Sequence, residues 1–272
     1  MKTFYQKIIP LIIAGCLFST FVFAQDFYFT AGGGYGFSMS SQNLPGFYNS
    51  ESNNDSATLE QVDVSLGKGV NFGGTFGYMF KKYLGAEIGI SYLSGSKTQV
   101  KDISDYGESV YSYSANMLRF IPSIVVTAGL DKINPYAKFG LIIGIGSVAN
   151  DFTYDEDSDL VERNYIMNGG VAFGCSAAAG VLVELNEYFS FYGEMNMINL
   201  SYAPAKGELV HATYNNNDML PDMSVKEKET EYLSSYTYNF QIPGPDDQPK
   251  KELKQKLPFG SIGINVGVQF RF

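Results

Sequence analysis

The last twelve residues of the chain, SIGINVGVQFRF (261–272), alternate strictly between apolar and small or polar side chains. The six even-numbered positions, from Ile262 to Phe272, are apolar, and glycine or polar residues fill the odd-numbered ones. A period of two indicates a β-strand whose two faces lie in different environments. At about 3.3 Å per residue the strand spans roughly 40 Å, which is enough to cross a bilayer even when tilted.

The same alternation recurs along the chain and predicts seven more strands. In each segment one parity is apolar, and the other is rich in glycine and polar residues. The eight predicted strands are 27–37, 70–80, 84–92, 117–128, 136–148, 168–185, 189–200 and 261–272. The expected fold class is therefore all-β, with long strands that each have one apolar face.

The connections between these strands are short and long in turn. Three of them are tight turns, near 81–83, 130–134 and 186–187. The other four are long and polar, at about 38–68, 98–112, 150–166 and 203–257. Short turns at one end and long loops at the other are typical of an up-and-down antiparallel transmembrane β-barrel, with periplasmic turns and extracellular loops. A water-soluble β-sandwich is the alternative fold.

One further segment alternates and leaves the strand number open. Residues 232–242 place Tyr232, Tyr236 and Phe240 on one parity. The preferred interpretation is a β-hairpin extension of the last long loop, which keeps eight strands in the barrel. If the segment instead crossed the membrane, a partner strand near 207–214 would make ten.

The N-terminus has the features of an export signal. Two lysines precede an apolar stretch from Ile8 to Phe23, and Ala24 stands before Gln25 at the expected cleavage site. We therefore expect a signal peptide at 1–24 and a single barrel domain at 25–272. The stretch around Cys16 is also similar to a bacterial lipobox, in which case Cys16 would be lipidated and become the mature N-terminus.

Charge and cysteine content exclude several classes of protein. The chain carries a formal net charge of −9, and the predicted signal peptide holds two lysines and no acid, so the mature chain is more acidic still. An acidic chain is a poor partner for nucleic acid, which needs a basic surface. Only Cys175 remains after the signal peptide, so the mature chain forms no internal disulfide.

The export signal, the eight alternating strands and the C-terminal Phe272 resemble the superfamily of small bacterial outer-membrane β-barrels, which includes OmpA, OmpX and OmpW-like proteins. The stretch Asn134-Pro135-Tyr136, followed by Ala137-Lys138-Phe139-Gly140, also resembles a strand start of that group. The resemblance implies a bacterial outer-membrane location. It also implies that Phe270 and Phe272 are part of a signal read by the barrel assembly machinery.

Aromatic residues gather near the predicted periplasmic ends of the strands. Such residues often form a girdle at the membrane interface. The expected members are Phe27, Phe80, Tyr83, Tyr136, Tyr188, Phe189, Phe270 and Phe272.

The predicted interior of the barrel contains six charged residues, three of each sign. They are Glu87, Arg119, Lys138, Glu184, Glu194 and Arg271. Charges in a narrow interior are tolerated when they are paired, so the sequence predicts a salt-bridge network that plugs the barrel. Glu87, Lys138 and Glu194 stand at similar heights above their turns and are expected to meet. The alternative is a gated polar pathway.

Other candidate sites carry weaker signals. His211 is the only histidine, and no serine or carboxylate stands beside it in a recognisable catalytic motif. The acidic run 155–159 lacks the spacing and glycine of a calcium loop, and the glycines at 32–36 lack the features of a phosphate loop. We therefore predict no catalytic, metal or cofactor site.

The leading hypothesis is a non-enzymatic outer-membrane protein with a plugged barrel, whose loops serve envelope integrity or surface interactions. Its expected partners are outer-membrane lipid, the assembly machinery and an external ligand of the loops. One alternative is a transport barrel for small solutes, or for hydrophobic molecules as in OmpW-like proteins. A less favoured alternative is a barrel hydrolase that uses His211.

Overall fold

The structure, a computed structural model, describes residues 27–39, 47–53, 55–156, 159–237 and 244–272. The predicted signal peptide and Cys16 lie outside these residues. The described part contains seventeen strands, a 3-10 helix η1 (Leu220–Asp222) and a four-residue helix α2 (Val225–Lys228). The all-β class is thus confirmed. None of the helices in the described part is long and apolar enough to span a membrane.

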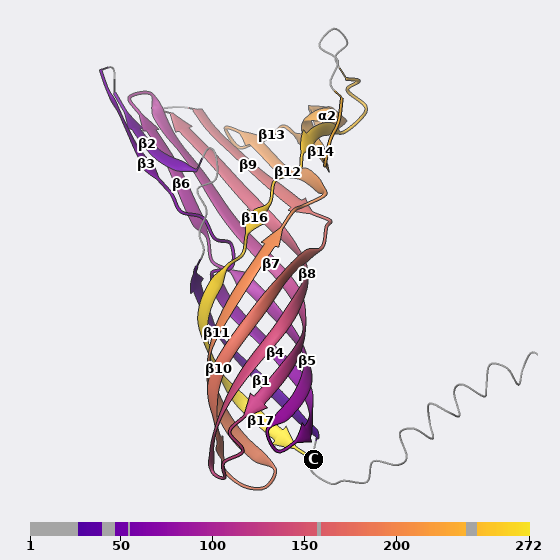
Figure 1. Cartoon of the computed structure of the whole chain (residues 1–272). Coiled ribbons are helices and arrows are strands. Elements are labelled where there is room, and N and C mark those ends of the chain that lie inside the picture. The colour runs from indigo at the N-terminus through magenta and orange to yellow at the C-terminus, as the bar shows by residue number, and fades with distance from the viewer. Residues whose placement is uncertain (1–26, 40–46, 54, 157–158, 238–243) are drawn as a thin grey trace, which may run out of the picture.

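Eight long strands form a closed antiparallel ring, which Figure 1 shows as a tall cylinder. They are β1 (Phe27–Ser38), β4 (Gly69–Lys81), β5 (Leu84–Gly95), β7 (Gly107–Thr127), β8 (Ile133–Glu156), β10 (Ala172–Glu184), β11 (Phe189–Tyr202) and β17 (Ser261–Arg271). Each strand pairs with the next one in this order, and β17 pairs back with β1. Each of the eight predicted segments overlaps one of these strands, but β7 begins ten residues earlier than predicted, β8 ends eight residues later, and β10 begins four residues later.

Three short turns join ring strands at one end of the cylinder, which we call the turn end. In the turn between β10 and β11, Asn186 Oδ1 accepts hydrogen bonds from the backbone N–H groups of Tyr188 and Phe189, both at 2.9 Å. In the turn between β7 and β8, Gly129 and Lys132 have φ angles of 65° and 64°. The C-terminus lies at this same end (Figure 1).

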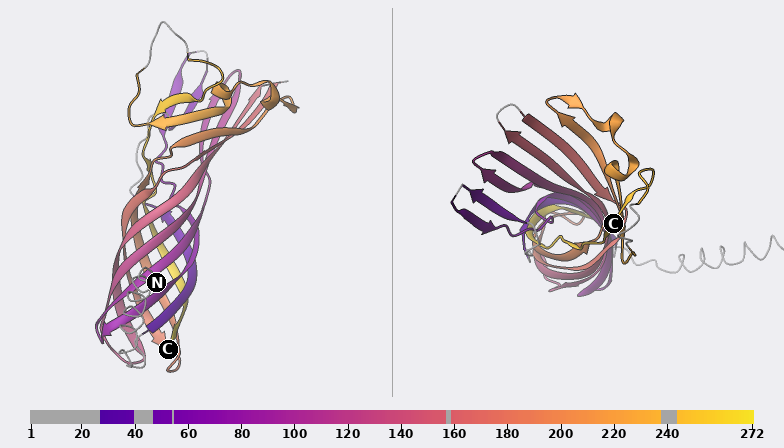
Figure 2. Two further views of the ribbon diagram at one scale, coloured as in Figure 1. Left: turned by 90° about the vertical axis from the view of Figure 1, so that its right-hand side faces the viewer. Right: turned by 90° about the horizontal axis from the view of Figure 1, so that it is seen from above.

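At the opposite end β7 and β8 continue beyond the ring and support an open sheet, which we call the extension sheet. Its other strands are β2 (Tyr48–Ser52), β3 (Ala57–Gln61), β6 (Thr98–Ser104), β9 (Asp159–Asn168), β12 (Lys206–Tyr214), β14 (Glu229–Leu233) and β15 (Lys250–Leu253). The pairing order is β3-β2-β6-β7-β8-β9-β12-β14-β15. Seen from above, it spreads to one side of the cylinder (Figure 2).

The extension sheet accounts for the difference between the eight strands predicted and the seventeen described. The segments expected to be loops form hydrogen-bonded ladders instead, and two very short strands, β13 (Asn217–Asp218) and β16 (Leu257–Pro258), add to the number. β12 coincides with the partner strand near 207–214 that a ten-stranded barrel would require, but it pairs with β9, β13 and β14 outside the ring. The alternating segment 232–242 contributes only its first two residues to β14, and residues 238–242 lie outside the described part.

The apolar residues that alternate along the ring strands face outward. Phe72, Ile88, Leu141 and Val266, from four different strands, are between 52% and 61% exposed. Other residues of the same parity on the ring strands share this exposure, so the apolar surface continues around the cylinder. A water-soluble monomer rarely exposes an apolar patch of more than a few hundred Å², so this face needs an apolar environment.

Candidate functional site

The interior of the ring holds a compact group of charges centred on Lys138 of β8. Its Nζ lies 3.1 Å from Oε1 of Glu87 on β5 and 3.5 Å from Oε2 of Glu194 on β11. The side chains are 16%, 4% and 11% exposed, respectively. One ammonium group thus joins two carboxylates from opposite sides of the ring and bridges the interior. We call these residues, with the side chains hydrogen-bonded to them, the Lys138 cluster.

Hydrogen bonds complete the cluster. The Tyr28 hydroxyl donates to Oε2 of Glu87 at 3.0 Å, and the Tyr136 hydroxyl donates to Oε2 of Glu194 at 2.9 Å. Asn265 Nδ2 donates to Oε1 of Glu194 at 3.1 Å. All four carboxylate oxygens therefore have a partner, which is the condition under which buried charges are tolerated.

Tyr136 lies inside the barrel, contrary to the expectation from the sequence. It was assigned to an aromatic girdle on the outside, but its side chain points inward and the residue is only 8% exposed. It shares its parity with Lys138, and this alternation is the signal that places it inside. Tyr28 likewise stands on the interior parity of β1 and was missed as a member of the cluster.

Glycines make room for these tyrosines. A side chain at Gly77 of β4 would collide with the ring of Tyr28, and one at Gly32 of β1 would collide with the hydroxyl of Tyr192. The Tyr192 ring in turn lies 5.9 Å from Nζ of Lys138. The interior glycines therefore leave the space in which large polar side chains reach across the narrow ring.

The other three predicted charges do not join the Lys138 cluster. Arg271 Nη1 lies 3.2 Å from Oε1 of Glu184, near the turn end, and these side chains are about one-third exposed. Arg119 of β7 is only 3% exposed. Its Nε is buried and has no hydrogen-bond partner among the described residues. Its guanidinium group also forms no ion pair with any of these residues.

Two cavities lie on either side of the Lys138 cluster. The lower one, of about 210 Å³, reaches toward the turn end and is lined by Lys82, Asp131 and Arg271 among others. The upper one, of about 110 Å³, is lined by polar side chains from several strands, including Asn71, Ser91, Arg119, Asn196 and Asn265. Four residues line both cavities and separate them: Thr30, Glu87, Lys138 and Tyr192.

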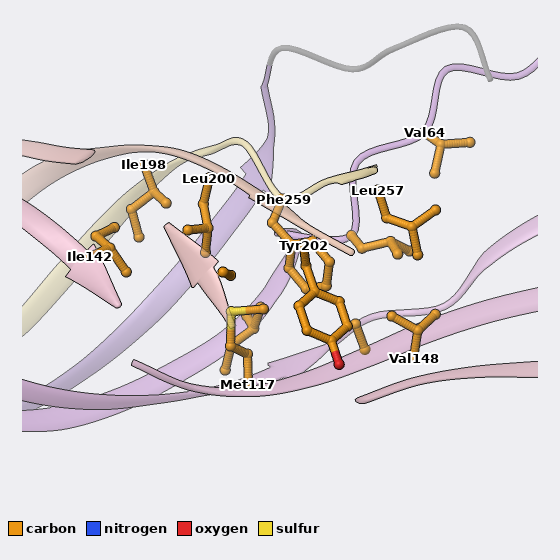
Figure 3. Packing of buried hydrophobic residues seen from close by; sticks show 13 residues of the cluster. Val64, Met117, Ile142, Val148, Ile198, Leu200, Tyr202, Leu257 and Phe259 are labelled. Atoms are coloured by element: carbon orange, nitrogen blue, oxygen red, sulfur yellow. The ribbon is translucent and has the colours of Figure 1, made fainter. Parts of the chain in front are cut away.

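Beyond the upper cavity, the interior is filled with apolar side chains, which we call the apolar cap (Figure 3). Its members are Val64, Leu66, Leu93, Ala115, Met117, Ile142, Val148, Ala172, Ile198, Leu200, Tyr202, Leu257 and Phe259. Ring strands supply most of them, while Val64 and Leu66 come from the segment before β4 and Leu257 and Phe259 from the segment before β17. The rings of Tyr202 and Phe259 meet edge to face at 5.9 Å.

The alternation along the strands did not predict the apolar cap. Its signal is a local loss of alternation, as at Leu141-Ile142-Ile143, where Ile142 falls on the interior parity between two outward-facing residues. Ser65 strengthens the cap by donating a hydrogen bond from its Oγ to the carbonyl of Gly260 at 2.5 Å. This bond joins the two connecting segments that enter the ring.

Comparison with known proteins agrees with this architecture. The family model for the outer membrane protein beta-barrel domain matches residues 11–226, which is most of the chain. The chain belongs to this family. Among solved structures, the chain is similar to the outer membrane protein OprG from Pseudomonas aeruginosa, with 13% sequence identity, a TM-score of 0.44, and coverage of 92% of this chain and 96% of that one. No curated protein matches the chain.

Outside the barrel, the extension sheet carries a groove of about 310 Å³. Its walls include Tyr111, Phe152, Arg163 and Tyr165, and the segment around α2 closes one side. The rings of Tyr111 and Phe152 lie 4.7 Å apart. Burial, together with a hydrogen bond to Tyr165, raises the pKa of Tyr232 next to this region. The groove presents aromatic faces and one guanidinium group.

His211 lies on β12 of the extension sheet and is exposed. It faces Asn164 in the ladder with β9, just after a register shift. Within the described residues its ring takes part in no hydrogen bond or ion pair, and no group of three metal-ligating side chains is found there. The structure therefore does not place His211 beside a nucleophile or a carboxylate partner.

The two C-terminal aromatic residues close the barrel at the turn end. The Phe270 ring packs edge to face against Phe272 at 4.7 Å and lies tilted against the Phe189 ring of β11 at 5.1 Å. The backbone N–H of Phe272 donates to the carbonyl of Phe27 at 3.0 Å. The last residues of β17 thus contact both neighbouring strands, β1 and β11.

Proposed function

We propose that the protein is a non-enzymatic barrel of the bacterial outer membrane, with eight membrane-spanning strands and an interior closed to ions. In this proposal the turns face the periplasm, and the extension sheet stands on the outer surface. Membership of the family supports the location, and the outward apolar parity supports contact with lipid. An N-terminal signal peptide, cleaved near Ala24, would direct export.

The observation that carries the proposal is the double closure of the interior. A charge cluster crosses the barrel at the level of Lys138, and thirteen buried apolar residues fill the outer mouth. An ion would have to displace the cluster and then enter an apolar region, where a charge is strongly disfavoured. We therefore assign the protein's role to its outer surface, in envelope integrity or surface interaction.

Single-channel conductance of the refolded mature protein in planar bilayers tests the closure. We expect a silent wild type and silent Phe259→Ala and Lys138→Ala variants, because each leaves one closure in place. The double variant is expected to conduct. The matched control, Lys97→Ala, alters an exposed lysine in the connection between β5 and β6 and should stay silent. Steady conductance of the wild type would overturn the proposal and favour transport of small solutes.

A second candidate function, lateral exit of apolar molecules, has one observation in its favour. Pairing between β7 and β8 lapses between Phe120–Ile143 and Ser123–Gly140, where Pro122 lacks a backbone N–H. An apolar groove lined by Phe76, Pro122 and Leu141 lies at this place on the outer face. If the lapse is an exit, Pro122→Ile should reduce the uptake of an apolar solute, whereas the structural proposal expects no change.

The contacts of the last strand support an assembly role for Phe270 and Phe272, as the resemblance to known barrels implies. Recognition by the barrel assembly machinery would require these residues to be free before β17 pairs with both neighbours. Deletion of Phe272 is expected to lower the amount of folded protein in the outer membrane. Refolding of the purified variant into detergent should be little changed, which would separate assembly from stability.

A further inference from the structure

We propose that the upper cavity is a binding site for a small inorganic monovalent anion, such as chloride, held by Arg119. The inference goes beyond the proposed function, because it holds whether or not the barrel conducts. It rests on a buried cation without a counter-charge, on free donors beside it and on the size of the cavity.

The buried cation is the first step. Arg119 is 97% buried, lines the upper cavity, and forms no ion pair with any described residue; its Nε is also without a hydrogen-bond partner. An arginine side chain stays protonated, so it cannot escape the cost of burial by losing its charge. A buried cation needs a counter-charge nearby.

The carboxylates that line this cavity are already engaged. Glu87 and Glu194 share Lys138 and accept hydrogen bonds from two tyrosines and an asparagine. Glu87 is also displaced from Arg119 along the strands, because it faces Ser123 in the β5–β7 ladder while Arg119 faces Ser91. Four residues along a strand correspond to about 13 Å. Neither carboxylate forms an ion pair with Arg119 among the described residues, so the single net negative charge of the Lys138 cluster is not a direct counter-ion of this guanidinium.

Hydrogen-bond donors surround the place where an anion would lie. Ser91, the residue opposite Arg119, has a buried hydroxyl without a partner in the described part. The amides of Asn71 and Asn196 line the same cavity. Asn265 Oδ1, a buried acceptor without a partner, is neutral and cannot supply the missing charge. An arginine, a hydroxyl and two amides form a suitable donor set for an anion.

The size and position of the cavity define the ligand. A volume of about 110 Å³ holds a small anion with a few waters, and a single unpaired guanidinium matches one negative charge. The apolar cap lies on one side and the Lys138 cluster on the other. The site thus lies inside the ring, between the apolar cap and the Lys138 cluster.

Replacement of chloride by bromide tests the site directly. Crystals of the wild type grown with sodium bromide are expected to give an anomalous peak within hydrogen-bond distance of the Arg119 guanidinium. In a nonionic detergent, the thermal unfolding midpoint of the wild type should rise and then level off as sodium chloride replaces sodium gluconate at constant ionic strength. Arg119→Met should lose this dependence. Arg163→Met, which removes an exposed arginine of the extension sheet, should keep it.

Two results would overturn the proposal. Absence of a bromide peak at Arg119, with equal midpoints in both salts, would mean that the Lys138 cluster neutralises Arg119 across the cavity. A chloride dependence that persists in Arg119→Met would place the anion elsewhere. The wild-type crystal experiment does not depend on any variant, so a variant that fails to fold leaves the proposal testable.

Discussion

Two lysine–carboxylate pairs in this molecule have nearly the same length and opposite surroundings. Lys138 and Glu87 lie 3.1 Å apart inside the barrel, with side chains 16% and 4% exposed. Outside the barrel, Nζ of Lys97, in the connection between β5 and β6, lies 2.9 Å from Oδ2 of Asp151 on β8, and these side chains are 62% and 35% exposed. Distance alone therefore does not rank the two ion pairs by their contribution to stability. Solvent and salt screen the exposed pair. The buried pair is desolvated, so its stability depends on the ion pairs and hydrogen bonds that replace the lost water.

The largest effect is expected inside the barrel. Lys138→Met should lower the free energy of unfolding by about 3–5 kcal/mol, because it leaves two buried carboxylates without a counter-ion. Urea unfolding in lipid vesicles, followed by far-UV circular dichroism because the chain has no tryptophan, measures the change. The triple variant Lys138→Met, Glu87→Gln, Glu194→Gln should recover most of the loss. A loss under about 1 kcal/mol for Lys138→Met would mean that water screens the interior.

An intermediate effect is expected for the pair at the turn end. Arg271 and Glu184 lie 3.2 Å apart, and their side chains are 33% and 29% exposed. Arg271→Gln should cost about 1 kcal/mol, since partial exposure weakens the pair. The same unfolding experiment, repeated at low and high salt, should show that the loss shrinks as salt rises. A cost equal to that of Lys138→Met would contradict a ranking by burial.

The smallest effect is expected on the extension sheet. Lys97→Ala removes an exposed pair and should change the free energy of unfolding by about 0.5 kcal/mol or less. Asp151 keeps its hydrogen bond from Asn164 in that variant, so the sheet retains its local contact. Hydrogen exchange of β7 and β8 amides above the barrel provides a sensitive measurement. A global loss comparable to that of Lys138→Met would mean that the sheet and barrel unfold as one unit.

Much of the barrel was predictable because alternation carries physical information. Parity alone separates outward Leu141 from inward Lys138, and the order of turns and loops sets which strands are neighbours. Parity does not report height, however, so Arg119 could be placed inside but not separated from the Lys138 cluster. It also does not show which glycine faces which tyrosine, and the contact of Tyr28 with Glu87 therefore became clear only from the structure.

The apolar cap and the extension sheet were not predictable for a different reason. Both depend on pairing between segments far apart in the chain, and such partners leave no local pattern. Phe259 packs against Tyr202, and Ser65 bonds to Gly260, from connections that otherwise have the polar composition of loops. Likewise, β12 is held by β9 and β14, so its strand character depends on neighbours rather than on its own alternation.

β8 runs without interruption from the barrel into the extension sheet. Its 24 residues extend about 80 Å, and at a tilt of about 40° this is a height of about 60 Å, whereas the apolar band of an outer-membrane barrel is about 25 Å tall. In the proposed membrane orientation, Phe152 of the groove on the extension sheet would lie well clear of the lipid headgroups, on the same strand as Lys138. Because β8 is a single strand from Ile133 to Glu156, a force applied at the groove would be transmitted along it to the Lys138 cluster inside the barrel.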